Sequence, residues 1–225
     1  MVSYLVENDI EKLLAQATGR LDHRSVALNV ACEYERIPRW LPDAVDPSRV
    51  FGLEINRDLV AQDPNIKYCD VDRDRFPFPD DGFDLIVSLF GVEHFQTDNV
   101  FHEAHRTLIS GGRFVFLVPN VLYPAFAINS LMGRRFAAFF YRRVMRSPYK
   151  PHETFYRFNR LGTIRSVAKR AGFSKTDITF FGPANILLYV HRFPFLKRVV
   201  TVVERVLTNR VLFRFKPYIL AVFEK

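Results

Sequence analysis

The stretch FDLIVSLFGVEHFQTDNVFHEAHRTLISGGRFVFLV, residues 83–118, contains two apolar segments with an amphipathic segment between them. Its ends, 83–89 and 113–118, are short and rich in β-branched and aromatic residues, which is typical of strands buried on both faces. Residues 99–109 repeat apolar side chains at every fourth position, the spacing of one helix face. The stretch therefore predicts a strand, a helix and a second, parallel strand joined by a right-handed crossover.

The same alternation of strand-like and helix-like segments continues on both sides of this stretch. Further strands are expected at residues 26–31, 50–55, 66–71, 175–181 and 218–223. Helices are expected at residues 37–44, 57–61 and 163–171, with Gly172 ending the last of them. We predict an α/β fold with a doubly wound, mostly parallel seven-stranded sheet, which is the Rossmann-like arrangement.

Two ranges interrupt this pattern, and both are interpreted as helical insertions in a single domain of residues 1–225. Residues 121–150 are apolar, aromatic and rich in arginine, whereas residues 183–216 separate the last two predicted strands. Within the second range, residues 195–215 have the pattern of an amphipathic helix. Its apolar face comprises Leu196, Val199, Val200, Val203, Val206 and Leu207. That face either packs on the sheet or, with the basic residues beside it, associates reversibly with an anionic bilayer.

The composition argues against several classes of protein. Hydrophobic residues make up 48% of the chain, and 23 Phe against 10 Gly argue against a disordered or fibrous protein. Cys32 and Cys69 are too few for a disulfide framework and are interpreted as reduced core thiols. The N-terminus is acidic where a signal peptide would be basic, and no segment reaches the roughly 18 apolar residues of a membrane span. We expect a cytoplasmic protein, with peripheral attachment at the inner face of a membrane as a further expectation.

The charge of the chain is divided unevenly between its two parts. Residues 1–133 contain 12 Lys/Arg and 20 Asp/Glu, a net of −8, whereas residues 134–225 contain 20 and 4, a net of +16. Such a basic half indicates an anionic partner, such as a phosphate, a lipid head group or a nucleic acid. The alternative is that the basic residues solvate the outer faces of amphipathic helices.

Carboxylates follow two of the predicted strands, at the edge where an open parallel sheet binds its ligands. Glu54, at the end of the second strand, can accept hydrogen bonds from a ribose diol, unless it is an exposed turn acid. Asp70, at the end of the third strand, can receive an adenine amino group, unless residues 70–75 are a solvated loop. These positions indicate a cofactor that contains a nucleoside.

Two histidines are candidate catalytic residues. His94 lies just beyond the fourth predicted strand, and its imidazole could take a proton from an attacking hydroxyl, unless it caps or packs. His152 begins HETFYR, residues 152–157, which follows a proline-bounded break and could recognise the phosphate or sugar of an acceptor, unless the segment is structural. His102 and His105 lie three residues apart on a predicted helix, where exposure is more common than metal binding, so no metal site is expected.

Three segments with a fixed order and spacing resemble the middle of the class I S-adenosylmethionine-dependent methyltransferases. They are FPDDGFDLIVS at 78–88, VEHF at 92–95 and EAHRTLISGGRF at 103–114. The resemblance covers residues 25–120, and more loosely 150–182 and 217–225, and is strongest to the small enzymes related to ubiquinone and polysaccharide-pathway methyltransferases. It implies the fold predicted above and S-adenosylmethionine as the cofactor.

The resemblance also implies cofactor contacts for residues after the predicted strands. Glu54 would hold the ribose hydroxyls, Ile55 would pack on the adenine, and Asp70 with Val71 would meet the adenine edge. The methionine side would be lined by Ser88, Leu89 and Phe90. The residues matched to the cofactor loop after the first strand are Asn29, Ala31, Cys32 and Glu33.

That first loop departs from the family pattern. The family has approximately DVGCGxG, whereas residues 29–35 read NVACEYE. Glycine lets the backbone approach the cofactor, while Glu33 and Glu35 add bulk and negative charge near a ligand that carries a carboxylate. This difference in the loop allows three outcomes for S-adenosylmethionine: weaker binding, binding in an altered pose, or loss of binding.

The function implied by the resemblance is methyl transfer from S-adenosylmethionine to a hydroxyl of a small-molecule, glycan or lipid-linked acceptor. A degenerate methyltransferase fold that binds without catalysis is an alternative, motivated by Glu33 and Glu35. An RNA methyltransferase is a second alternative, motivated by the basic half, although the sequence contains no recognised RNA-binding module. The expected partners are therefore a small-molecule or glycan acceptor and an anionic membrane surface, and nucleic acid is a less favoured partner.

Overall fold

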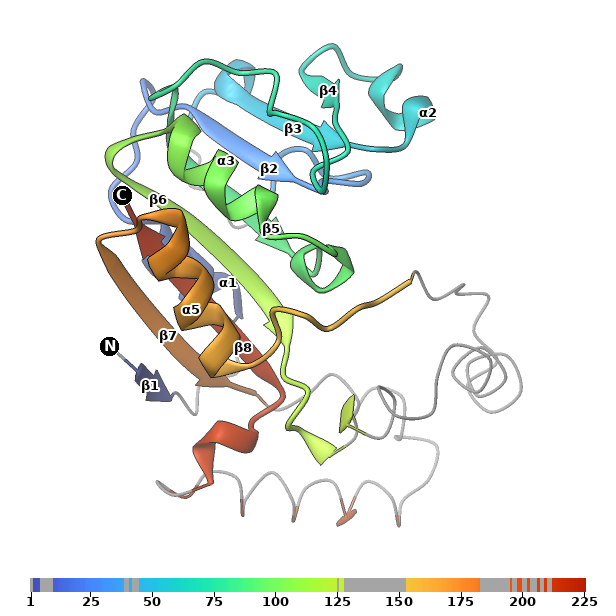
Figure 1. Ribbon diagram of the computed structural model, residues 1–225, viewed down its shortest axis with the longest axis vertical. Helices are drawn as coiled ribbons and strands as arrows, with labels where there is room; N and C mark the ends of the chain where they lie inside the picture. Colours follow the sequence, from blue (N-terminus) through green and yellow to red (C-terminus); the bar gives the residue numbers. More distant parts are fainter. Residues whose placement is uncertain are drawn as a thin grey trace.

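The computed structural model describes residues 2–4, 10–38, 41, 45–124, 126–127, 153–182, 195, 198–199, 202, 206, 209 and 212–225. Within these residues the chain forms one sheet with helices on both of its faces (Figure 1). The predicted insertions at 121–150 and 183–216 and the predicted helix at 37–44 lie mostly outside the described residues, and His152 lies wholly outside them.

Eight strands form this sheet in the order β1-β7-β8-β6-β5-β2-β3-β4. The strands are β1 Val2–Tyr4, β2 Ala27–Val30, β3 Val50–Glu54, β4 Ile66–Tyr68, β5 Phe83–Leu89, β6 Leu108–Pro119, β7 Lys175–Phe181 and β8 Tyr218–Glu224. Strand β8 is antiparallel to both of its neighbours, and all the other pairs are parallel. The predicted doubly wound, mostly parallel sheet is confirmed, with each predicted strand in place. Strand β1 is an additional short strand at the edge beside β7, which the sequence did not indicate.

Helices cover the two faces of the sheet. They are α1 Ile10–Thr18, α2 Arg57–Val60, α3 Asn99–Thr107 and α5 Leu161–Ala171, with 3-10 turns η1 Pro47–Arg49, η2 Val92–His94 and η3 Phe213–Phe215. Helices α3 and α5 lie side by side on one face, where Phe101 and Ile164 are buried in the larger core (Figure 1). Helix α1, which was not predicted, lies on the opposite face, where Leu14 belongs to a second core.

The central strands β5 and β6 contribute side chains to both cores in alternation. Ile86 and Phe114 belong to the core beneath α3 and α5, whereas Leu85 and Val115 belong to the core beneath α1. Each of these four side chains is fully buried. Because successive residues of a strand point to opposite faces, a strand covered on both sides is apolar throughout. This geometry accounts for the largely apolar segments, 83–89 and 113–118, that predicted the two strands.

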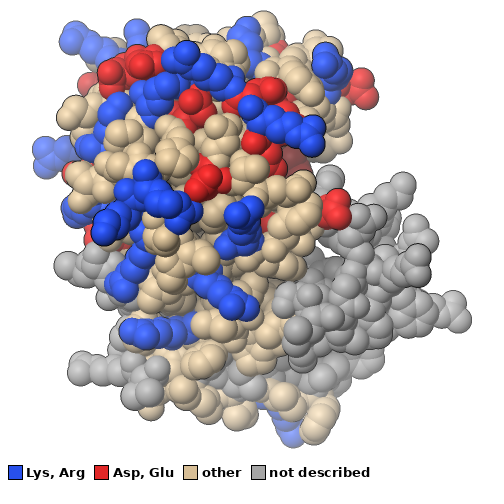
Figure 2. Space-filling model, in the orientation of Figure 1, with Lys and Arg blue, Asp and Glu red and all other residues tan. Residues whose placement is uncertain are grey.

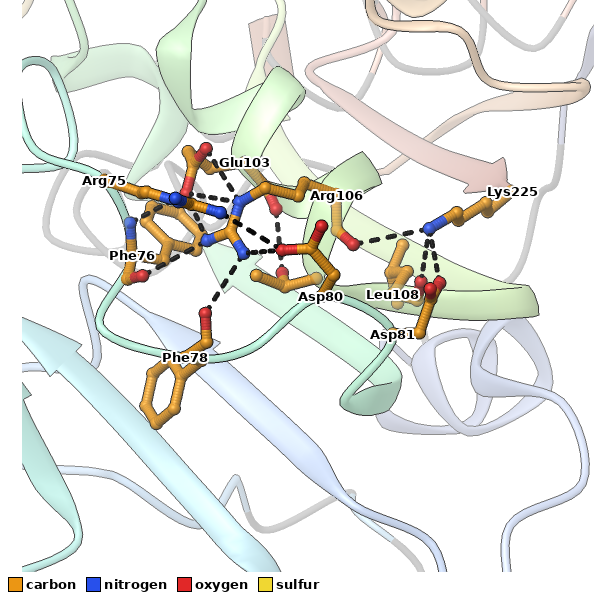
Figure 3. A network of polar contacts seen from close by, with 10 residues as sticks. Arg75, Phe76, Phe78, Asp80, Asp81, Glu103, Arg106, Leu108 and Lys225 are labelled. Atoms are coloured by element: carbon orange, nitrogen blue, oxygen red, sulfur yellow. Dashed lines mark hydrogen bonds and ion pairs between the residues drawn. The ribbon is translucent and has the colours of Figure 1, made fainter.

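A polar network ties the segment before β5 to helix α3 (Figure 3). The guanidinium of Arg106 donates to the Glu103 carboxylate at 2.6 Å, to Asp80 at 2.5 Å and to the carbonyl oxygens of Phe76 and Phe78 at 3.2 and 3.1 Å. The Glu103 carboxylate also accepts a hydrogen bond from the backbone N–H of Phe76 at 2.8 Å. The resembling segments FPDDGFD and ExxR therefore meet in space, and their polar residues fix the turn that leads into β5.

Replacing Arg106 by Gln should lower the free energy of unfolding by roughly 2 to 4 kcal/mol, because it leaves the mostly buried Glu103 carboxylate and two carbonyl oxygens without their donor. Asp80→Asn is the matched control, because Asp80 is an exposed partner of the same guanidinium and its loss should matter much less. Urea denaturation of both variants measures the difference. Equal losses for the two variants would contradict this account of the network.

Candidate functional site

The loops after β2 and β5 meet at the switch point of the sheet, where the strand order reverses. The backbone N–H of Ala31 donates to the Leu53 carbonyl oxygen at 2.9 Å, which ties the loop after β2 to the end of β3. On the other side, a Cβ atom placed on Gly91 would lie 2.9 Å from the Cβ of Ala31 and 2.6 Å from the Oγ of Ser88. Only glycine fits at position 91. The structure thus brings together three of the predicted contacts, Ala31, Glu54 and Ser88, at the ligand-binding edge of an open α/β sheet.

The first loop keeps left-handed backbone conformations without glycine. Ala31 has φ +56° and Glu33 has φ +46°, and these are two of the positions at which the family pattern has glycine. Both Glu33 and Glu35 are exposed. Asn29 holds the far end of the loop, because its side-chain amide donates to the Glu35 carbonyl oxygen at 2.8 Å. The altered sequence therefore retains a backbone conformation suited to glycine at Ala31 and Glu33, at a cost in strain.

The carboxylate of Glu54 is bonded to backbone on both sides of this edge. One oxygen accepts from the N–H groups of Ile55 at 2.9 Å and Asn56 at 3.0 Å, and the other accepts from the N–H of Glu33 at 3.0 Å. The residue is only 7% exposed, so the interpretation of Glu54 as an exposed turn acid is wrong. A carboxylate offers about four acceptor positions, and the bonds to Glu33, Ile55 and Asn56 use three of them. The site therefore retains capacity for a ribose hydroxyl.

The residues predicted to meet the adenine lie beside Glu54. Ile55 is 58% exposed, as a side chain that packs on a base would be, whereas Val71 is buried. Asp70 is partly buried and accepts a hydrogen bond from the N–H of Asp72. Asp72 in turn accepts from the N–H groups of Gln96 and Thr97, both at 2.9 Å. Within the expected loop of residues 70–75, Asp70 and Asp72 therefore belong to a hydrogen-bonded corner, whereas residues 73–75 are exposed.

The remaining predicted contacts follow β2 and β5. Ser88 is fully buried, and its Oγ has no hydrogen-bond partner among the described residues. Leu89 is partly exposed, and Phe90 is exposed at φ +55°, with its ring edge-on to Tyr218 at 5.8 Å. Cys32 is buried, and burial raises the pKa of its thiol to about 12, so that it is a packing residue rather than a nucleophile at neutral pH.

Turn η2 carries His94 and is covered by the segment that follows the predicted acceptor residue His152. The Nδ1 of His94 lies 2.5 Å from the carbonyl oxygen of Glu153. The N–H groups of Phe155 and Tyr156 donate to the carbonyl oxygen of Glu93 at 2.9 and 3.2 Å. Residues 153–156 and His94 therefore form one unit at the end of β5, although 59 residues separate Glu153 from His94.

Glu93, which lies just beyond the fourth predicted strand beside His94, is a buried acid. It is 6% exposed, and its Oε2 has no hydrogen-bond partner among the described residues. Burial raises the pKa of this carboxyl to about 8, so that it is largely protonated at neutral pH. Its position directly before His94, in the segment VEHF, was the available sequence signal, but the sequence does not reveal its burial.

Histidine pairs do not form a metal site in the part of the chain that the structure describes. No group of three or more His, Cys, Asp or Glu residues in that part could hold a metal ion. The ring of His105 packs edge-on against Phe173 at 5.2 Å, and His102 Nε2 lies 4.0 Å from an Asp98 oxygen. Both histidines therefore have contacts on the surface of α3 that are unrelated to a metal.

Comparison with known proteins finds a family that matches part of the chain. The family described as "Methyltransferase domain" matches residues 28–116. A rat protein, 2-methoxy-6-polyprenyl-1,4-benzoquinol methylase, mitochondrial, is 29% identical over 112 residues, which cover 44% of this chain and 34% of the relative. The aligned region thus spans about a third of that relative's length. The family match covers residues 28–116, which is less than half of the chain, and supports the expected resemblance to class I S-adenosylmethionine-dependent methyltransferases.

Solved structures extend the fold over nearly the whole chain. An S-adenosylmethionine-dependent methyltransferase from Mesorhizobium loti has a TM-score of 0.57 at 19% identity, covering 96% of this chain and 97% of that one. A protein from Galdieria sulphuraria, described as a putative sarcosine dimethylglycine methyltransferase, has a TM-score of 0.56 at 19% identity, with 96% and 84% coverage. Phosphoethanolamine N-methyltransferase 2 of Haemonchus contortus, in complex with S-adenosylmethionine, has a TM-score of 0.53 at 15% identity, with 96% and 52% coverage. At these identities the likeness concerns the fold.

Glu33→Gly should stabilise the protein by up to about 1 kcal/mol, because glycine removes the strain of a side chain at φ +46°. Glu35→Gly removes the same charge in the same loop, but the backbone of Glu35 is not left-handed, so this change should destabilise through the greater freedom of the unfolded chain. Thermal denaturation of the two variants measures the difference in sign. Stabilisation by both changes would mean that charge, and not backbone strain, dominates in the loop.

Glu93 should make the stability of the protein fall as the pH rises from about 5 to about 8. In that range the unfolded chain has released the Glu93 proton, whose reference pKa is 4.5, while the folded chain retains it. The contribution amounts to about 1.4 kcal/mol per pH unit while only the folded state is protonated. Glu93→Gln should remove this dependence, so that the variant gains stability relative to the wild type with rising pH. Denaturant titrations across the range test this, and parallel pH profiles would refute it.

Proposed function

We propose that this chain transfers the methyl group of S-adenosylmethionine to a hydroxyl of a small, partly apolar acceptor. The observation that carries the proposal is the 2.5 Å contact between His94 Nδ1 and the Glu153 carbonyl oxygen. A carbonyl oxygen only accepts hydrogen bonds, so Nδ1 carries the ring proton and Nε2 has the lone pair. The Thr154 hydroxyl lies 3.5 Å from the same Nδ1, too far to compete.

The residues of the switch point fit the cofactor. Glu54 would hold a ribose hydroxyl with its remaining acceptor capacity, Ile55 would pack on the adenine, and the left-handed loop at Ala31 and Glu33 would face the methionine part. S-adenosylmethionine supplies a methyl group on a sulfonium, which is electrophilic without further activation. The protein therefore has to align the acceptor, exclude water and accept a proton.

Proton acceptance would fall to His94. Its Nε2 is the basic atom of the tautomer that Glu153 selects, and it is suited to take the proton of a hydroxyl as that oxygen is methylated. Glu93, directly before His94 in the chain, is largely protonated at neutral pH and so adds little negative charge to this end of β5. Phe155 and Tyr156, through their bonds to the Glu93 carbonyl oxygen, would keep the covering segment on the turn.

The side chains near His94 favour an acceptor with an apolar part. Phe90, Leu122 and Phe155 are exposed apolar residues on the loops that follow β5 and β6 and on the segment that covers η2. The rat relative is named for a polyprenyl benzoquinol, a compound with a long apolar chain. A hydroxyl on a lipid-linked or aromatic acceptor agrees with both observations, and a glycan part of such an acceptor would meet the polar residues of 153–157.

A non-catalytic binding protein with this fold is the second candidate. It is favoured by the side chains of Glu33 and Glu35, which add bulk and negative charge in the loop where the family pattern has glycine. Binding of S-adenosylmethionine, measured by calorimetry, separates the candidates first. No binding at millimolar cofactor would refute the enzyme and leave the binding protein.

His94→Asn tests the catalytic role directly. The asparagine amide can still donate to the Glu153 carbonyl oxygen, but it cannot accept a proton as the imidazole does. We expect methyl transfer to fall by about 10²- to 10⁴-fold while the affinity for S-adenosylmethionine changes little. The assay uses tritiated S-adenosylmethionine with a panel of phenols, catechols, polyprenyl quinols and sugar lipids, and with amines as the contrasting class.

His94→Ala is the companion variant, because it also removes the bond to Glu153. If alanine and asparagine reduce transfer equally and cofactor binding is intact, proton acceptance is the function that matters. If asparagine retains full activity, His94 only positions the covering segment and the proposed role is wrong. Transfer to amines but not to hydroxyls would overturn the proposed acceptor class.

A further inference from the structure

A row of apolar side chains lies exposed on the segment between β7 and η3. Phe195 is 76% exposed, Val199 43%, Val202 58% and Val206 52%. Each of these positions has helical backbone, and their spacing of four, three and four residues places them along one helix face. In Figure 1 the coloured parts of this segment lie along the lower rim, beyond the ends of β7 and β8.

The row shows that part of the amphipathic segment is not covered by the sheet. Val199 and Val206 belong to the apolar face predicted from the sequence, and both are exposed; the other four residues of that face lie outside the described residues. Four large apolar side chains aligned on one helix face differ from apolar residues scattered singly over a surface. Such a row is typical of a binding surface.

The charge around the row is positive. Residues 195–215 contain five Lys/Arg and one Asp/Glu, a net of +4, within the half of the chain whose net charge is +16. Arg198, next to Val199, is exposed, as is Arg214 of η3. Figure 2 shows acidic and basic side chains interspersed over the upper part of the molecule, and mainly basic ones lower down, over α5.

We propose that this exposed row docks the protein on an anionic lipid bilayer. Apolar side chains that enter the interface between head groups and acyl chains, flanked by Lys and Arg that meet lipid phosphates, are the requirements for reversible surface binding. A nucleic acid would use the positive charge but offers no apolar layer for Phe195 and the valines. Among the described residues, the structure has no helix that is both long and apolar enough to span a bilayer.

The docking segment is tied to the edge of the sheet that carries the candidate site. The side-chain amide of Asn120, directly after β6, donates to the carbonyl oxygens of Arg214 at 2.8 Å and Lys216 at 2.7 Å. Asn159, near the covering segment, donates to the carbonyl oxygen of Pro119 at 2.6 Å. Turn η3, the end of β6 and the chain that leads to α5 therefore meet at this edge. Docking would bring the edge near the lipid, where an acceptor with an apolar part is found.

Co-sedimentation of the full chain with vesicles tests the proposal without cofactor or acceptor, so its outcome is independent of the proposed methyl transfer. The vesicles contain phosphatidylcholine with rising fractions of phosphatidylglycerol, at low and at physiological salt. We expect the bound fraction to rise with the anionic lipid and to fall with salt. Val199→Ser combined with Val202→Ser should weaken binding by about tenfold or more, because two side chains no longer bury apolar surface in the bilayer.

Two charge reversals provide the matched comparison. Arg198→Glu lies within the row and should weaken binding by about fivefold or more, whereas Lys169→Glu makes the same change on the exposed face of α5 and should have about a twofold effect at most. All variants change exposed residues, and melting curves check that they fold. Equal effects of the two reversals, or vesicle binding unchanged in the double serine variant, would overturn the proposal. Binding to RNA at physiological salt without binding to vesicles would overturn it in favour of nucleic acid.

Discussion

The Glu54 carboxylate accepts hydrogen bonds from three backbone N–H groups, and these bonds fix the backbone at the ligand-binding edge of the sheet. One of these groups belongs to Glu33, in a loop where Ala31 and Glu33 are left-handed. A non-glycine residue in that conformation costs about 1 to 2 kcal/mol, and a hydrogen bond to a charged group contributes about 1.5 to 3 kcal/mol. The bond from the Glu33 N–H to this carboxylate can therefore offset strain in the loop, which explains how Glu33 keeps a left-handed backbone that suits glycine.

The polar residues that follow β4 and β5 and those of α3 divide into two groups with different tasks. Arg106 and Glu103 join helix α3 to the turn before β5, and Asp72 holds the backbone of residues 96 and 97. These residues stabilise the frame. Glu93 and His94 form the second group: the Glu93 carboxyl is buried, and the Nδ1 of His94 lies 2.5 Å from the Glu153 carbonyl oxygen. Their environment of burial and a fixed tautomer instead suits proton chemistry at the acceptor.

The edge that would hold the acceptor and the segment that would meet lipid are joined through Asn120. A protein that binds a surface through a few side chains orients itself on that surface, and an edge tied to those side chains is carried with them. The acidic first part of the chain would be repelled by an anionic bilayer, and the basic second part attracted. The division of charge along the chain would therefore favour one orientation of the protein on the surface.

The sequence by itself determined the doubly wound sheet, because strands buried on both faces are continuous apolar runs and their alternation with helices leaves few topologies. It also placed Glu54, Asp70 and His94 at strand ends, where parallel strands put them at one edge. It could not show that Glu93 is buried, that Glu54 is bonded to the loop at Glu33, or that Glu153 selects the tautomer of His94. These properties arise between residues far apart in the chain or from burial in the folded molecule. Only the tertiary structure decided them, because desolvation and hydrogen-bond partners depend on which segments the fold brings into contact.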